Sequence, residues 1–168
     1  NDIAIHAVDV IPWITGLQFT RINAARCWNA LAADFPHFED AAQMMLTLEN
    51  GCGVLGDVSY FAPGQIGYML PFYWRMTLWG SRGVIETSMR AGKITMVQTA
   101  SEVPQALPLP DGNPGGYLEA FMRDIAGTSE PGMLDTAQVL RAARVALLIQ
   151  RAADAHQPDV HRMDVSIG

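Results

Sequence analysis

Two alternating runs of apolar and polar residues, joined by an Asn-Gly dipeptide, form the clearest local pattern in the chain. Residues 40–49 and residues 53–61 each place apolar side chains at every second position, as strands with one buried face do. Asn50 and Gly51 between them tolerate the positive φ angles of a tight turn. The pattern therefore predicts a β-hairpin.

Further strands are predicted by alternation on both sides of this hairpin. They cover residues 19–28, 72–79, 84–88 and 93–99. Sequential strands with short turns are typical of an antiparallel meander. Residues 102–116 contain four prolines and little periodicity, so we expect a long surface connection there.

Three segments have the period of an amphipathic helix. The first covers residues 2–12 or a little more and should end at Gly16, and the second covers residues 116–126. With the strands between them and a third helix after them, the chain is predicted to be α+β. We expect a mostly antiparallel, open-faced sheet of five or six strands with the helices packed on one face.

The third helix is predicted to cover residues 135–155. Asp135 followed by Gln138 has the spacing of a capping box, in which each residue satisfies a backbone N–H of the other's turn. Most of this helix is apolar, which indicates burial against the sheet. We interpret Arg141 and Arg144 as its solvated face.

The composition is apolar for a self-contained domain, with 49% hydrophobic and 17% charged residues. If all helices lie on one sheet face, the other face stays open and carries Met45, Leu55, Phe61, Tyr73 and Trp79. Such a face should be buried against another subunit. We therefore expect a homo-oligomer.

The formal charge of −6 and the single lysine argue against a nucleic-acid or anionic-membrane surface. No apolar run approaches the roughly 20 residues of a membrane span. Cys27 and Cys52 lie far apart without metal-ligand spacing, which favours reduced cysteines, a cytoplasmic protein and no metal site. The chain opens on Asn1, directly in a helical pattern, so we expect that an upstream portion is missing.

A cluster of titratable residues lies on the first predicted helix. Asp2 and His6 are four residues apart and Asp9 follows three later, so a helix places all three on neighbouring parts of one face. A histidine between two carboxylates can move protons near neutral pH. The spacing alone also fits a structural role, with Asp2 as an N-cap and Asp9 as an orienting group.

Other candidate sites are weaker. Residues 80–83 (Gly-Ser-Arg-Gly) lie between predicted strands, whereas a phosphate loop should open a helix. Residues 51–53 (Gly-Cys-Gly) are assigned to a turn, and no dinucleotide-binding fingerprint is expected. The four tryptophans could stack on a sugar, but large aromatic residues in strands more often pack in a core or an interface.

Four motifs occur in a characteristic order along the chain. They are the Asp2, His6 and Asp9 spacing with Trp-x-x-Gly at 13–16, Leu-Glu-Asn-Gly at 48–51, Trp-Gly-Ser-Arg-Gly-Val-Ile-Glu at 79–86, and Tyr117 with Phe121 before the last helix. Together they resemble the C-terminal domain of the glucose-fructose oxidoreductase / inositol dehydrogenase / MocA (Gfo/Idh/MocA) family of NAD(P)-dependent oxidoreductases. The resemblance covers nearly the whole chain.

The resemblance implies that this chain, residues 1–168, is the substrate-binding and oligomerisation domain of a larger enzyme. An absent N-terminal Rossmann domain would bind NAD or NADP and supply a catalytic lysine, so the isolated chain should bind no cofactor and be inactive. The implied reaction is hydride transfer between nicotinamide and a secondary alcohol of a sugar, polyol or related small molecule. The open sheet face would form a dimer or tetramer interface.

The resemblance also implies roles for individual residues. His6 would be the acid/base and Asp2 its orienting partner or an acceptor for a substrate hydroxyl. Asp9, Trp13 and Tyr117 would contact the substrate. Two other functions stay open: a non-catalytic sugar-sensing or oligomerisation module of the same family, and a glycosidase that works by transient NAD-dependent oxidation.

Overall fold

The computed structural model describes residues 3–61, 73–109, 112, 116–130, 132–155 and 161–162. The chain divides into two compact units. The first unit joins residues 1–61 to residues 115–168, and the second is formed by residues 62–114.

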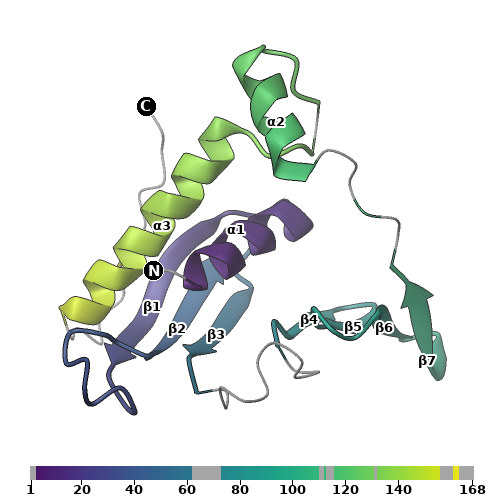
Figure 1. Cartoon of the computed structure of the whole chain (residues 1–168). Coiled ribbons are helices and arrows are strands. Elements are labelled where there is room, and N and C mark those ends of the chain that lie inside the picture. Colours follow the sequence, from purple (N-terminus) through teal and green to yellow (C-terminus); the bar gives the residue numbers. More distant parts are fainter. Residues whose placement is uncertain are drawn as a thin grey trace. The chain divides into compact units, whose positions relative to one another are not determined.

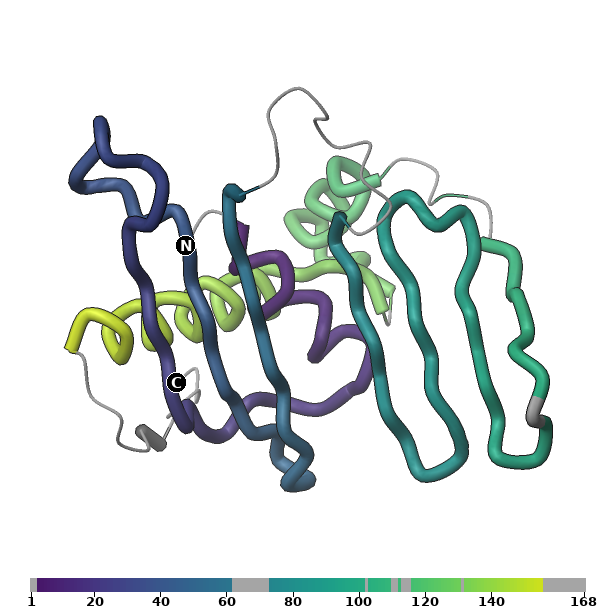
Figure 2. Tube along the Cα trace, turned by 90° about the horizontal axis from the view of Figure 1, so that it is seen from below, coloured from purple at the N-terminus to yellow at the C-terminus, as the bar shows by residue number. Residues whose placement is uncertain are grey.

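The first unit contains a four-stranded antiparallel sheet in the order β3-β2-β1-β8. Helices α1 and α3 lie on one face of this sheet (Figure 1), and α3 crosses the strands (Figure 2). The bounds of its elements are α1 Ala4–Thr15, β1 Phe19–Trp28, β2 Ala41–Leu48, β3 Gly53–Ser59, α2 Gly116–Ile125, α3 Thr136–Asp154 and β8 His161–Arg162.

Alternation along the strands builds the core of this unit. Leu46 of β2 is only 2% exposed, whereas the preceding residue, Met45, is on the other face of the sheet and is 49% exposed. The inward side chains pack against Val8 of α1 and against Val145 and Ile149 of α3. Burial of such side chains is the main force that fixes the helices on the sheet.

The predicted hairpin is confirmed. β2 and β3 pair in antiparallel register, and Gly51 in the connecting turn has φ +87°. The Asn50 side chain accepts a hydrogen bond from the Cys52 N–H at 3.0 Å. The turn therefore uses the two residues that the sequence indicated.

One buried carboxylate organises the connection between β1 and β2. The side chain of Asp40 is 3% exposed and accepts hydrogen bonds from the N–H groups of Ala30, Leu31 and Ala32 at 2.7 to 3.0 Å. Burial acts to raise the pKa of Asp40, but these donors outweigh it and hold the pKa below its ordinary value of 3.8. The ionised carboxylate thus stabilises this loop.

The second unit is an antiparallel meander of four strands, in which each strand pairs with the next along the chain (Figure 2). Its elements are β4 Met76–Gly80, β5 Gly83–Thr87, β6 Lys93–Gln98 and β7 Ser101–Pro108. Gly83 has φ +153°, and a Cβ atom there would lie 2.1 Å from the Val97 carbonyl oxygen. Only glycine fits this position without moving the backbone.

The α+β class and the antiparallel pairing are confirmed. Among the described residues the strands form two sheets of four, whereas one sheet of five or six was predicted. Alternation marks a strand without specifying its pairing partner, so it cannot decide whether the strands join in one sheet or in two. The predicted strand at 72–79 also begins later, at Met76. Trp74 has φ +53°, which is incompatible with an extended strand.

The connection expected at residues 102–116 is wrong over its first half, because β7 covers Ser101–Pro108. The strand lies at the edge of its sheet and pairs only with β6 among the described residues. Pro104 lies in the stretch where the register between β6 and β7 shifts. An edge position and an irregular register are where a strand tolerates proline.

Candidate active site

Helix α1 displays the predicted cluster on one stripe of its surface. His6 is exposed, Asp9 is half-buried three residues later, and Trp13 is 59% exposed a further turn along. The buried Val8 marks the other side of the helix. Asp2 lies outside the described residues. The structure therefore places three of the four predicted residues of α1 on one face.

The local sequence stabilises α1 weakly. Its N-cap position is Ile3, which has no side chain that can accept a hydrogen bond, and Pro12 inside the helix has no N–H to donate. At the other end Gly16 has φ +70° and donates its N–H to the Pro12 carbonyl at 2.8 Å. The position of α1 consequently depends on contacts with other elements.

Two hydrogen bonds attach α1 to the region where α3 begins. The amide Nε2 of Gln138 donates to Oδ1 of Asp9 at 3.3 Å. The indole N–H of Trp13 donates to the carbonyl of Gly132 at 3.0 Å. Both bonds start from the stripe that carries His6, so they fix the orientation of that stripe.

The predicted capping box is half correct. Asp135 is the N-cap of α3, and its carboxylate accepts the Gln138 N–H at 2.6 Å. The Gln138 side chain reaches across to Asp9 instead of returning to Asp135. The sequence located the start of the helix, while the second partner is a tertiary contact.

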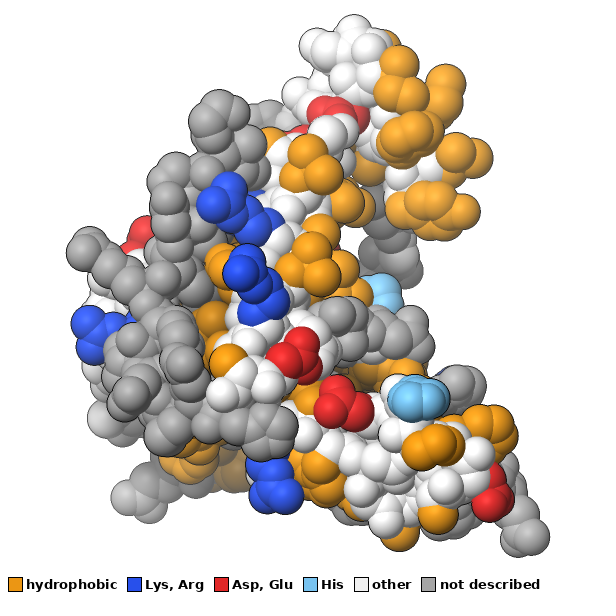
Figure 3. Space-filling view, turned by 90° about the vertical axis from the view of Figure 1, so that its left-hand side faces the viewer, with side chains coloured by type: hydrophobic (Ala, Val, Ile, Leu, Met, Phe, Trp, Pro, Cys, Tyr) orange, Lys and Arg blue, Asp and Glu red, His pale blue; other side chains and the backbone are white. Residues whose placement is uncertain are grey.

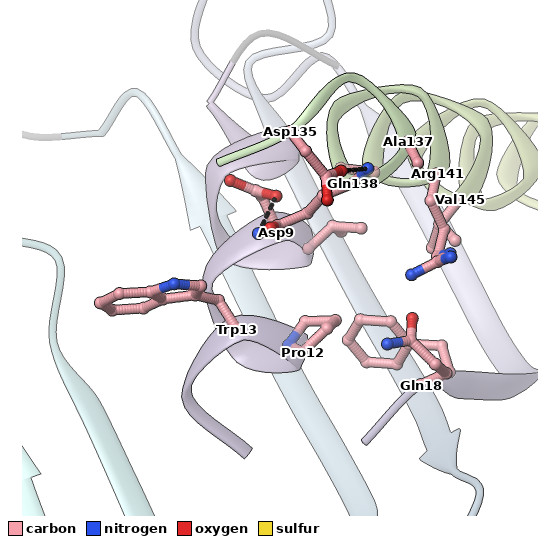
Figure 4. A pocket seen from close by; sticks show the side chains of 12 residues that line it. Asp9, Pro12, Trp13, Gln18, Asp135, Ala137, Gln138, Arg141 and Val145 are labelled. Carbon is pink, nitrogen blue, oxygen red and sulfur yellow. Dashed lines mark hydrogen bonds between the residues drawn. The ribbon is translucent and has the colours of Figure 1, made fainter. Parts of the chain in front are cut away.

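A cavity of about 170 Å³ opens between α1, α3 and the start of β1 (Figure 4). Asp9 and Trp13 contribute to its wall, whereas His6 and Tyr117 do not line it. Figure 4 shows Trp13 and Arg141 on opposite sides of it. The lining residues are Val8, Asp9, Pro12, Trp13, Gln18, Phe19, Asp135, Ala137, Gln138, Arg141, Ala142 and Val145.

Helix α2 presents an apolar surface. Figure 3 shows hydrophobic side chains gathered on this helix at the top of the molecule. Tyr117 in its first turn is 81% exposed, and Phe121 and Ile125 on the following turns are 55% and 66% exposed. Among the described residues, no hydrogen bond or ring contact joins Tyr117 to the stripe of α1. The amphipathic pattern predicted for residues 116–126 is present, but its apolar side chains are exposed.

α2 is tied to the N-terminus of α3 by one carboxylate. Asp124 accepts hydrogen bonds from both the hydroxyl and the N–H of Thr136, the latter at 3.0 Å. These bonds hold the pKa of Asp124 below its ordinary value. The attachment leaves the apolar side chains of α2 uncovered.

The part of the chain that the structure describes contains no group of three or more side chains placed to hold a metal ion. Cys27 and Cys52 are both free thiols, and burial raises the pKa of the Cys27 thiol. None of the described helices is long and apolar enough to span a membrane.

The described residues do not fit the diphosphate of a dinucleotide. Residues 51–56 have the letters Gly-x-Gly-x-x-Gly, but they form the hairpin turn and the start of β3, not the first turn of a helix. At α3 the N-terminal position is taken by the Asp135 carboxylate, which would repel a phosphate. These letters at 51–56 therefore do not form a dinucleotide-binding turn.

Comparison with known proteins decides the family. Residues 1–86, half of the chain, match the profile described as the GFO/IDH/MocA C-terminal domain. The chain belongs to the Gfo/Idh/MocA family. The order of motifs in the sequence had indicated the same family. No curated protein matches the sequence.

Solved structures of oxidoreductases share the fold of this Gfo/Idh/MocA domain. A protein of Thermotoga maritima described as an oxidoreductase has a TM-score of 0.79 and 25% identity over 95% of this chain and 45% of its own. UDP-N-acetylglucosamine 3-dehydrogenase of Acidithiobacillus ferrooxidans has a TM-score of 0.70 and 19% identity, over 90% of this chain and 46% of its own. For the aldose-aldose oxidoreductase of Caulobacter crescentus the values are 0.72 and 18%, over 95% and 45%. The chain thus spans about half the length of these structures.

Three polar residues of the cavity, Gln18, Gln138 and Arg141, were not predicted from the sequence as part of a site. Arg141 was assigned to the solvated face of α3, but it is half-buried and lines the cavity. Gln138 was assigned a capping role only. The available signal was their spacing, because positions 138, 141, 142 and 145 follow one side of a helix that includes the buried Ala142 and Val145.

Proposed function

We propose that this chain is the substrate-binding half of an NAD(P)-dependent oxidoreductase. The full-length protein would transfer a hydride between nicotinamide and a secondary alcohol of a sugar, polyol or related small molecule. Family membership and the oxidoreductases among the similar structures support this reaction class. The observation that carries the proposal is an exposed histidine, His6, on a helix whose same stripe bears Asp9 and Trp13.

His6 is the proposed acid/base. Oxidation of a secondary alcohol releases a hydride, which the cofactor accepts, and a proton, which His6 removes from the hydroxyl oxygen. Imidazole suits this step because its ordinary pKa lies near neutral pH. Asp2, four residues earlier on the same stripe of the helical pattern, would orient the ring or accept a substrate hydroxyl.

The proposed substrate contacts are Asp9, Trp13 and Tyr117. Asp9 keeps one carboxylate oxygen beyond its bond to Gln138, and the exposed indole of Trp13 can stack on the C–H face of a sugar. Tyr117 offers an exposed phenol on α2. A polyhydroxylated substrate also agrees with two proteins of similar fold, a UDP-N-acetylglucosamine 3-dehydrogenase and an aldose-aldose oxidoreductase.

The cofactor would be held by a Rossmann domain outside this chain, because the described residues do not fit its diphosphate. Two observations support a second domain. The similar structures are about twice the length of this chain, and α2 exposes apolar side chains that an adjoining domain would cover. On this proposal the 168 residues alone do not catalyse the reaction.

We also propose that the protein self-associates through exposed sheet residues of the two units. In the first unit Leu55 and Met45 pair across β3 and β2 and are 81% and 49% exposed. In the second unit Trp79 is 80% exposed. Phe61 is 40% exposed after β3, whereas Tyr73 is half-buried.

The test is an activity screen of the full-length protein. Neutral sugars, polyols and nucleotide sugars are incubated with NAD and with NADP, and the reduced cofactor is followed by its absorbance. The proposal expects turnover with at least one such alcohol. Cofactor binding without turnover on the whole panel would favour a non-catalytic, sugar-sensing role instead.

A further inference from the structure

The cavity between α1 and α3 contains polar side chains that the described residues leave unsatisfied. Arg141 is half-buried in its wall, yet it makes no hydrogen bond or ion pair within the described part of the chain. The side-chain amide of Gln18 also lines the cavity and likewise makes no hydrogen bond within the described part of the chain. A guanidinium has five N–H donors, and a half-buried one normally has partners.

The acceptors of the cavity are partly used. Oδ1 of Asp9 accepts from the Gln138 side chain, and Oδ1 of Asp135 accepts from the Gln138 N–H. Each carboxylate keeps its second oxygen. The cavity therefore presents donors and acceptors together, over an apolar floor that includes Val8 and Val145.

We propose that this cavity binds a neutral polyhydroxylated ligand, about the size of one sugar ring. Hydroxyl groups both donate and accept, so they can satisfy Arg141, Gln18 and the free oxygen of Asp9 at once. A volume of about 170 Å³ is close to the volume of about 150 Å³ of a cavity engineered in another protein, which holds benzene. Six ring atoms therefore fit.

The charges of the cavity select against anions. Two carboxylates, Asp9 and Asp135, face a single guanidinium, Arg141, so the net charge of the lining is negative. A carboxylate or phosphate on the ligand would be repelled in a partly desolvated site. Trp13 borders the cavity, and Figure 4 shows its indole pointing away from Arg141.

The inference rests on the proposed function and extends it. Asp9 is one helical turn from His6, and His6 does not line the cavity, so a ring bound there would be a part of a larger substrate that is remote from the reacting carbinol. Arg141 and Gln18 are then specificity-determining residues. They hold hydroxyl groups and take no part in the proton transfer.

The experiment is a calorimetric titration of the full-length protein with glucose, xylose and myo-inositol, and with glucuronate as the anionic counterpart of glucose. Arg141→Met removes the guanidinium and keeps the aliphatic stem, while Arg141→Lys keeps a charge but loses the planar donor pair. Arg151→Met is the matched control, because Arg151 is exposed on the same helix and does not line the cavity. Loss of hydrogen bonds from a charged donor should weaken binding about tenfold or more in Arg141→Met.

The expected pattern is binding of a neutral sugar or polyol that is weaker in Arg141→Met, intermediate in Arg141→Lys and unchanged in Arg151→Met. The inference is overturned if no neutral probe binds, if Arg141→Met binds as the wild type does, or if glucuronate binds more tightly than glucose. Arg141-dependent binding without any turnover would support the cavity and refute the oxidoreductase. Turnover that is unchanged in the Arg141 variants would support the oxidoreductase and refute the role of the cavity.

Discussion

The hydrogen bond between Gln138 and Asp9 should measurably stabilise α1. Gln138→Met keeps a side chain of similar length and helix propensity but removes the Nε2 donor. Bonds to a charged acceptor contribute about 1.5–3 kcal/mol. The 3.3 Å length is at the long end for N–H···O, and both side chains are only half-buried. We therefore expect a loss of about 1 kcal/mol, felt mainly by α1.

Amide hydrogen exchange can measure this loss of stability in α1 separately from the rest of the fold. A change of about 1 kcal/mol corresponds to roughly fivefold faster exchange of the α1 amides that open locally, with little change in β2. Gln43→Met is the matched control, since Gln43 donates to Asp57 at 3.2 Å on the outer face of the sheet. Unchanged exchange in α1, or equal acceleration in α1 and β2, would refute the anchoring argument.

Three further perturbations test the fold and its surfaces. Gly83→Ala should lower the free energy of unfolding of the second unit by about 1–3 kcal/mol, because the added Cβ would meet the Val97 carbonyl. Gly53→Ala is the control, since open space surrounds that position. Equal losses of stability in the two variants would contradict this. The pKa of Asp40 is lowered in the fold, so its stabilising effect is present above its ordinary value of 3.8 and is lost as the pH falls through the folded value. Asp40→Asn should therefore flatten the acid limb of the pH–stability curve, and an unaltered limb would rule this out. Leu55→Asp should dissociate an oligomer in sedimentation velocity, and a monomeric wild type would exclude that interface.

Local chemistry made much of the fold predictable. Gly16 and Gly51 adopt the positive φ angles that helix ends and tight turns require, and Asp135 caps α3 as its spacing indicated. The stripe of His6, Asp9 and Trp13 follows from the helical period alone.

Long-range contacts were not predictable in the same way. The bond from Gln138 to Asp9 joins residues 129 positions apart, and no local pattern encodes such a pair. Arg141 was misassigned because helical spacing shows which residues share a side but not whether a neighbouring element leaves a cavity there. β7 was missed because proline counts against a strand unless its edge position is known.

Steady-state kinetics of His6→Ala in the full-length protein test the central claim most directly. If His6 is the acid/base, kcat should fall about 10²- to 10⁴-fold, while the dissociation constant of the cofactor, bound by another domain, stays the same. Protein folding is checked by the exchange protection of β2, whose core position does not depend on an exposed histidine. An unchanged kcat in a folded variant would contradict the assignment.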